Sequence, residues 1–489
     1  MDSQNKIYII GLLILYTFAI SYIGYRNRKN RNSEEYFLAS RSLPAWLLAV
    51  TFIASWWGGG SAIDLVDQAH DQGISSFWIY GVSVLVATAL MFVFSGGIRR
   101  IATISQPELV EKRYDSRSAF MAAIFIIIFM VLGATVQVIV IGNFFQTFFG
   151  ISYTYSAIVG TALVLIYSLF GGFKGVVITD LFQFVFFLIA SLFLFGITYY
   201  YSGGMEHIYE KVINSEKEGY TSFFHNIENN IAYVITFGTS WMIQANVWQR
   251  ISASRSPKDA RKMMAISFLV FIPLYLITTI TGMLSVTIFD TVPEGGVVSN
   301  LLLLLDMPIV SGLIFVGLCS AIMSTMDSMF NTGALSLTVD IYKKHIHPNK
   351  SAQHYVLIGR VSTFLIAVVA LLVGLNIKSV LTVSWIGADF LTTGVFIPLV
   401  LGFLWKRGTS TAALASMIFG LLFSTYNLLY ELGANIPIGW EIASTEQALV
   451  GISLSLVLFV TISLLTKSDH ELSKAKAFID TVQIVKRKK

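Results

Sequence analysis

Apolar residues run along this chain in long blocks that are separated by short polar turns. A block of about 20 apolar residues is long enough to cross about 30 Å of hydrocarbon as a helix. Within lipid, a helix satisfies its own backbone hydrogen bonds without help from water. The pattern therefore predicts an all-α polytopic membrane protein with about thirteen transmembrane helices, at residues 7–25, 46–66, 76–98, 118–148, 151–170, 175–201, 230–249, 263–289, 307–336, 354–376, 380–405, 410–430 and 447–466.

The composition agrees with this pattern and excludes a soluble protein of this length. Of 489 residues, 55% are hydrophobic and 12% are charged, and the mean hydropathy is +0.71. The single cysteine, Cys319, lies within an apolar block, so we expect no disulfide. The block 7–25 is too long for a signal peptide, lacks a basic segment before it, and has its arginines after it, so we interpret it as a retained first span.

The net charge of +5 does not indicate a nucleic-acid surface. The positions of the basic residues instead predict how the chain is oriented in the membrane. With the N-terminus outside, all but four of the 33 lysines and arginines fall on the cytoplasmic side, as the positive-inside rule requires. We therefore expect a multi-pass protein of the cell membrane with a cytoplasmic C-terminus and no nucleic-acid partner. The basic segments are 26–44, 99–117, 250–262, 339–360, 406–407 and 467–489, with Lys174 in a further turn.

The order of the spans suggests two repeats of five helices with opposite orientation, which is a common plan in transporters. The expected division is an extra helix and inner loop (1–45), a first repeat (46–201), an external loop (202–229), a second repeat (230–405), two further helices (406–466) and a basic tail (467–489). We expect "WWGGGS" (56–61) to break the first helix of the first repeat, and Gly238 to break that of the second. The tail is either an amphipathic helix on the inner leaflet or a solvated segment.

One membrane block carries an unusual group of polar residues, in "AIMSTMDSMFNTG" (321–333). On a helix, Ser324, Thr325 and Ser328 share one face, and Asp327 is three positions from Ser324. A single hydroxyl of this kind usually bonds back to its own helix. Three hydroxyls beside a carboxylate instead favour a site for a hard cation.

Other acids also fall inside apolar blocks. Asp180 lies near the inner end of its span, where it faces an ion path or pairs with Lys174. Asp389 is a third intramembrane acid, whereas Asp64 and Asp67 follow the glycine run and are expected to line an outer vestibule.

Several stretches resemble the sodium:solute symporter family, over about residues 30–410. They are "EEYFLASRSLP" (34–44), "TISQPELVEKRY" (103–114), "GGFKGVVITD" (171–180), "QR" (249–250) and "AIMSTMDS…DIY" (321–342). The core motifs are most similar to the bacterial choline- and amino-acid-transporter-like branches. The resemblance implies a leucine-transporter-like core of two inverted five-helix repeats, plus one N-terminal and two C-terminal helices.

The resemblance also implies two sets of ion ligands, with sodium as the only metal and no organic cofactor. The shared sodium site would use the carbonyls of Ala54, Trp57 and Ala321 and the hydroxyls of Ser324 and Thr325. A second sodium, known in members similar to the bacterial sialic acid symporters, would use Asp180, Ser324, Asp327 and Ser328. Asp327 replaces a hydroxyl that those members carry, so it either strengthens the second site or takes a proton instead.

The candidates for contact with the solute are Trp56, Trp78, Gln244, Asn246 and Asp389. Tryptophans would suit a quaternary ammonium through cation–π attraction. Gln244, however, stands where the choline branch has a cage tryptophan. Each aromatic residue could equally be a packing or interfacial residue.

These features predict sodium-coupled import of a small polar organic solute, such as an amino acid, a betaine or a monocarboxylate, by alternating access. The alternatives are a proton-coupled symporter of the same fold and a transporter-derived sensor. No motif of an enzyme is found in the sequence. The expected partners are the solute and the lipid bilayer, and the oligomeric state stays open, a monomer included.

Overall fold

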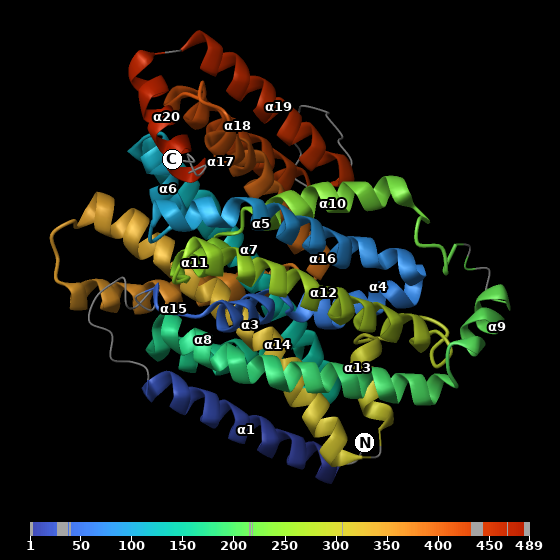
Figure 1. Cartoon of the computed structure of the whole chain (residues 1–489). Helices are drawn as coiled ribbons and strands as arrows, with labels where there is room; N and C mark the ends of the chain where they lie inside the picture. Colours follow the sequence, from blue (N-terminus) through green and yellow to red (C-terminus); the bar gives the residue numbers. More distant parts are fainter. Residues whose placement is uncertain are drawn as a thin grey trace.

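Every regular element in the described part of the chain is a helix (Figure 1). The computed structural model describes residues 3–26, 38, 41–214, 217, 219–305, 307–431, 444–466 and 468–483. Most of the stretch 34–44 and the final "KRKK" therefore lie outside the described residues. The helices, with short π- and 3₁₀-helical segments labelled η, are α1 (Ser3–Arg26), α3 (Ala45–Trp56), η2 (Gly60–Asp64), α4 (Leu65–Gln72), η3 (Gly73–Ser76), η4 (Trp78–Val82), α5 (Ser83–Ile101), α6 (Gln106–Arg113), α7 (Ser116–Phe149), α8 (Tyr153–Ser202), α9 (Glu206–Asn214), α10 (Ile227–Met242), α11 (Ala245–Ala253), α12 (Pro257–Ser285), α13 (Val297–Leu304), α14 (Pro308–Leu335), η5 (Ser336–Ile346), α15 (Ala352–Asn376), α16 (Val380–Leu391), η6 (Thr392–Phe396), α17 (Ile397–Leu404), α18 (Ser410–Glu431), α19 (Ser444–Leu465) and α20 (Asp469–Gln483).

Ten helical stretches in the described residues are long and apolar enough to cross a membrane, or eleven if one bent pair counts as a span. The chain is thus a multi-pass membrane protein. Two of the thirteen expected spans do not meet this criterion. The expected span 151–170 corresponds to the apolar stretch Tyr153–Leu169, which is the short first part of α8. The expected span 230–249 is divided between α10 and α11.

The glycine run breaks the first core helix, as the sequence predicted. Helix α3 ends at Trp56, the backbone of Trp57 leaves the helical region (φ −84°, ψ 71°), and a helical path resumes with η2 and α4 at an angle of 69°. The break also brings the backbone close to α14, because a methyl group on Gly58 would lie 2.4 Å from Thr325 Oγ1. A residue without a side chain is therefore required there.

The second break lies five to six residues beyond the position that we predicted. Helix α10 continues through Gly238 to Met242, and the interruption falls at Ile243 and Gln244, before α11. The prediction of a break at Gly238 is wrong, because Gly238 stays in helical geometry and serves as a packing position. A methyl group there would meet Ser83 O at 3.6 Å, an ordinary contact distance.

Helix α8 combines two expected spans in 50 residues with one sharp kink. The kink is at Gly172, whose φ of 55° and ψ of −172° are accessible to glycine at little cost. Helix α14 packs along α8 and beside α3 and α7, through the middle of the molecule (Figure 1). The polar face of α14 is thus turned inward, with Ser324, Thr325, Asp327 and Ser328 each at most 3% exposed.

Helix α1 lies at one edge of the helical array, beside α8, and α18–α20 lie at the opposite edge (Figure 1). Helix α20 turns its apolar side to the protein rather than to lipid, since Ala475, Phe478 and Ile479 are at most 7% exposed. Phe478 packs edge-on against Phe403 of α17, with ring centroids 5.6 Å apart.

Polar contacts hold the two ends of α20. Glu471 Oε1 accepts from the backbone N–H of Ser410 at 2.8 Å, at the start of α18. At the other end, Arg100 of α5 donates to the carbonyl oxygens of Thr481 and Val482. Lys474 also donates to the carbonyl oxygen of Tyr114, so α20 connects elements from both halves of the chain.

Candidate functional site

The broken helix α3 and the polar face of α14 meet at Ala54. The Ala54 carbonyl oxygen lies 2.6 Å from Ser324 Oγ and 3.3 Å from Thr325 Oγ1. Ser324 Oγ also lies 2.9 Å from the carbonyl oxygen of Ala321. Four oxygens of the predicted shared sodium site are therefore gathered in one buried place.

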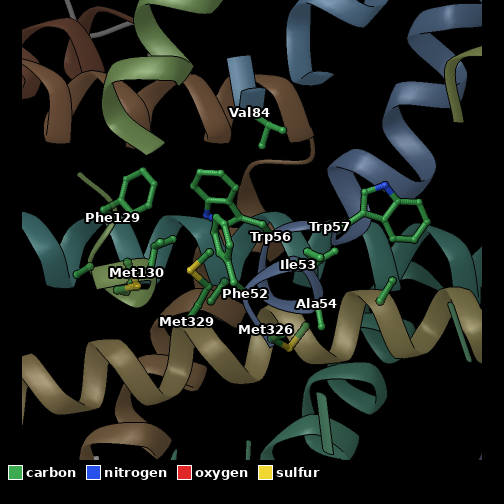
Figure 2. Packing of buried hydrophobic residues seen from close by; sticks show 14 of the residues in the cluster. Phe52, Ile53, Ala54, Trp56, Trp57, Val84, Phe129, Met130, Met326 and Met329 are labelled. Atoms are coloured by element: carbon green, nitrogen blue, oxygen red, sulfur yellow. The ribbon is translucent and has the colours of Figure 1, made fainter. Parts of the chain in front are cut away.

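The fifth residue of that predicted site, Trp57, lies at the end of α3. Its backbone is outside the helical region, so its carbonyl is not committed to the helix. Trp56 and Trp57 point to opposite sides of the chain, with Ala54 on the side of α14 (Figure 2). The Trp57 ring packs at a tilt against Phe187, with ring centroids 4.8 Å apart, which holds this end of α3 in position.

Gln137 of α7 supports the break from the other side. Its Oε1 accepts from the backbone N–H of Gly59 at 2.8 Å, which satisfies an amide that the broken helix leaves unpaired. Gln137 is a polar residue within a strongly apolar span, which could have indicated this role, but it was not among the predicted residues.

One acid of the predicted second site, Asp180, contacts an arginine. Arg250 of α11 donates from Nη2 to Asp180 Oδ2 at 3.3 Å and to Ser328 Oγ at 2.8 Å. Asp180 thus pairs with Arg250 rather than with Lys174, which is exposed. Asp327 lies close enough to interact with both charges, and its polar side-chain partner is Ser168 of α8.

A cavity of about 80 Å³ lies next to the glycine break. By this measure one water needs about 10–15 Å³, so the cavity has room for roughly half a dozen waters or a solute of similar size. Its lining combines aromatic and neutral polar side chains with small residues, and it contains no charged side chain. The lining residues are Ser55, Trp56, Gly58, Gly60, Ser61, Tyr80, Val84, Phe129, Gly133, Val136, Gln137, Trp241, Gln244, Tyr275, Thr325, Met329, Val383, Ser384 and Gly387.

Two of the five predicted solute contacts line this cavity. Trp56 donates from its indole N–H to Gln244 Oε1, so the two helix breaks meet there. Figure 2 shows the Trp56 ring between Phe129 and Val84, which also line the cavity.

The other three predicted contacts lie elsewhere. Trp78 donates to the Phe223 carbonyl at 2.8 Å, and its ring packs at a tilt against the Phe223 ring. The backbone carbonyl of Asn246 accepts from Arg250. Asp389 accepts from Thr393 at 3.1 Å, and neither of these two residues lines the cavity.

Aromatic residues that the sequence analysis missed form much of the cavity wall. Trp241 stacks on Phe237 at 5.0 Å and contacts Trp56 at 5.8 Å. The Tyr275 hydroxyl lies 2.8 Å from Ser61 Oγ, across the break. These residues are far apart in sequence, so spacing alone gave no signal for them.

A second cavity, of about 420 Å³, lies on the far side of the glycine break from α3. Asp64 and Asp67 line it, as expected of residues in a vestibule, together with Glu294. Asp67 Oδ1 accepts from the backbone N–H of Val297 at 2.7 Å, at the first residue of α13. Both acids thus belong to this acidic cavity rather than to the ion site.

Paired discontinuous helices that meet at a buried polar site are the structural plan of secondary transporters. The breaks at residues 57–59 and 243–244, with the cavity between them, place this chain in that class of protein. A sequence model of the sodium:solute symporter family matches residues 36–420, and the chain belongs to this family. It is therefore a membrane transporter that couples sodium to the movement of a small solute.

Relatives of known function cover nearly the whole chain. The osmoregulated proline transporter OpuE of Bacillus subtilis (strain 168) is 25% identical, over 99% of this chain and 100% of OpuE. The sodium/proline symporter of Staphylococcus aureus (strain Newman) is 26% identical, over 98% of this chain and 96% of that protein.

Solved structures confirm the fold. A Na+-coupled sialic acid symporter, in a substrate-bound outward-open state, superposes with a TM-score of 0.79 at 16% identity, over 94% of this chain and 97% of that one. The leucine-transporter-like core that the resemblance implied is thus shown.

Proposed function

We propose that one sodium ion binds between the break in α3 and the face of α14, and that it drives import of a small neutral or zwitterionic solute held in the adjacent cavity. The observation that carries this proposal is the meeting of the Ala54 carbonyl with the hydroxyls of Ser324 and Thr325. The carbonyls of Trp57 and Ala321 complete the ligand set. Oxygen ligands without sulfur or nitrogen suit a hard cation.

The position of this site explains how ion and solute are coupled. Thr325 belongs both to the ion site and to the lining of the cavity, and Gly58 lies between them. An ion that joins α3 to α14 therefore fixes one wall of the cavity before the solute binds. Loss of the ion loosens the same wall and releases the solute.

The lining of the cavity indicates the solute class. A solute with a net charge would need a charged partner once it is dehydrated, and the cavity offers none. Aromatic faces at Trp56, Tyr80 and Trp241 suit an apolar ring or a cationic nitrogen. L-Proline, the solute named in both relatives, is small, zwitterionic and apolar on its ring, and it is the first candidate.

The remaining parts of the proposal are an outside N-terminus, a cytoplasmic C-terminus, and the division into two repeats at 46–201 and 230–405. The lysine and arginine distribution supports the orientation. We also propose that the chain carries out transport alone and catalyses no reaction. The second sodium site at Asp180, Ser324, Asp327 and Ser328 stays a prediction, and the contacts of Arg250 favour another arrangement there.

The test is uptake of radiolabelled solutes into proteoliposomes that contain the purified protein. We expect uptake of L-proline or a similar zwitterion that is abolished when external sodium is replaced by potassium. Uptake that survives the replacement, and that is lost when the proton gradient is removed, would instead establish proton coupling. Binding of solute without any uptake would support a sensor.

A further inference from the structure

Asp389 is a buried carboxylate that belongs neither to the proposed sodium site nor to the solute cavity. It lies on α16, inside a membrane span, and is 3% exposed. Among the described residues, it takes part in no ion pair. An unpaired carboxylate is costly in a region that excludes water, so its charge must be compensated by a proton or by a cation.

Polar side chains from two further elements surround this carboxylate. Thr393 of η6, one turn later, donates from Oγ1 to Asp389 Oδ1 at 3.1 Å. Ser424 and Asn427 of α18 also lie close enough to interact with the carboxylate. All of them are at most 5% exposed. We call the four residues the Asp389 cluster: Asp389, Thr393, Ser424 and Asn427.

The two members of the cluster on α18 lack partners within the protein. Ser424 Oγ and Asn427 Nδ2 are buried and make no hydrogen bond with any residue that the structure describes. Buried polar groups are nearly always paired. Two unpaired groups beside one buried carboxylate therefore indicate a place for a bound ligand. The hydroxyls and the carboxylate offer oxygen, and an amide offers oxygen once it rotates about its terminal bond.

The packing of α18 and α19 encloses the cluster. Gly420 lies one turn before Ser424 on the same face of α18, and a methyl group there would lie 2.5 Å from Gly394 Cα. The backbones of α18 and η6 are thus in direct contact. Helix α19 covers the other side, because a methyl group on Gly451 would lie 2.4 Å from Thr393 Oγ1.

The cluster faces away from the solute cavity. Gly387 of α16 lines that cavity, and Asp389 follows it by two positions. Two positions turn an α-helix by about 200°, so the two residues lie on opposite faces. The cluster also shares no residue with either predicted sodium site.

We propose that the Asp389 cluster binds one monovalent cation, sodium or potassium, at a site separate from the transport path. Oxygen donors without sulfur suit such a hard ion. One carboxylate and one monovalent cation leave no net charge, which satisfies the requirement for compensation at this depth. The ion joins α16 and η6 to α18, and so holds the C-terminal helices to the core.

The experiment counts radioactive sodium bound per purified full-length protein at saturation, and separately radioactive rubidium as a tracer for potassium. The starting variant carries Ser324→Ala and Thr325→Ala, which remove two ligands of the proposed sodium site. We expect this variant to bind one cation per protein. Adding Asp389→Asn, which keeps the size of the side chain, should abolish that binding.

Ser424→Ala tests the cluster without a change of charge. Added to the same starting variant, it should weaken cation binding by at least about tenfold, because the ion loses one polar contact. Ser416→Ala is the matched control. Ser416 lies two turns earlier on α18 and is fully buried, but its hydroxyl donates to the Ala413 carbonyl of its own helix. This variant should keep the affinity.

Two results would overturn the inference. A folded starting variant that binds neither ion would show that Asp389 holds a proton instead. An ion that stays bound to folded Asp389→Asn would lie elsewhere in the protein. If Asp389→Asn does not fold, Ser424→Ala decides, and an unchanged affinity refutes the site.

The inference does not depend on the proposed function. If the starting variant does not fold, the same comparison is made in the wild type, where Asp389→Asn should lower the count by one. Solute uptake by the wild type without sodium would refute the proposed function and leave this difference in bound cations unchanged.

Discussion

Replacing Ser324 with alanine removes one oxygen from the proposed sodium site and leaves the helix backbone intact. The Ser324 hydroxyl lies 2.6 Å from the Ala54 carbonyl and is fully buried, so no water can substitute for it without rearrangement. A polar contact with a charged group contributes about 1.5–3 kcal/mol. We therefore expect sodium affinity to fall by about 10- to 150-fold.

The assay is the sodium concentration at half-maximal uptake in proteoliposomes, measured at saturating solute. Ser320→Ala is the matched control. Ser320 lies one turn earlier on α14 and is equally buried, but its hydroxyl donates to Gly317 and to Gln183 of α8, away from Ala54. The control should keep the wild-type value.

The reasoning is refuted if Ser324→Ala shifts that concentration by less than about twofold, a difference of about 0.4 kcal/mol. It is also refuted if Ser320→Ala causes the same shift, because the effect would then arise from packing of α14. Thr325→Ala should shift the value in the same direction but less, since Thr325 Oγ1 is farther from Ala54, at 3.3 Å.

Three further predictions follow from close contacts. Gly58→Ala places a methyl group 2.4 Å from Thr325 Oγ1, so sodium-dependent uptake should be lost, whereas Gly196→Ala, with nothing within 4 Å, should keep it. Gln137→Ala leaves a buried amide of the break unpaired and should cost about 1–3 kcal/mol of stability, seen as a lower melting temperature in detergent. Phe478→Ala removes the buried ring by which α20 packs on Phe403, and should cost up to about 3–5 kcal/mol of packing free energy. Protease cleavage of α20 should then be faster. Unchanged cleavage would show that this ring does not hold the helix.

The membrane spans and the first helix break could be predicted from local sequence. Hydrocarbon requires long apolar helices. Three successive glycines at 58–60 destabilise a helix interior and let the backbone pack closely against a neighbour, so they indicate a break. The group on α14 was also visible, because helical spacing alone places Ser324, Thr325 and Ser328 on one face.

The second break and the partner of Asp180 could not be predicted in the same way. Gly238 is a packing glycine, and at the break Gln244 contacts Trp56, which lies 188 residues earlier. Asp180 and Arg250 are 70 residues apart, and only the packing of α8, α11 and α14 brings them together. Long-range pairs of this kind leave no periodic signal.

The contacts of α20 also bear on how the protein is made. Arg100, in the second helix of the first repeat, takes its carbonyl partners from Thr481 and Val482, which the ribosome adds after every span has been synthesised. This end of the first repeat therefore stays incomplete until α20 has been synthesised and has packed against α5. A reporter protein fused before residue 469 would interrupt that last assembly step, whereas one attached beyond residue 483 would leave it intact.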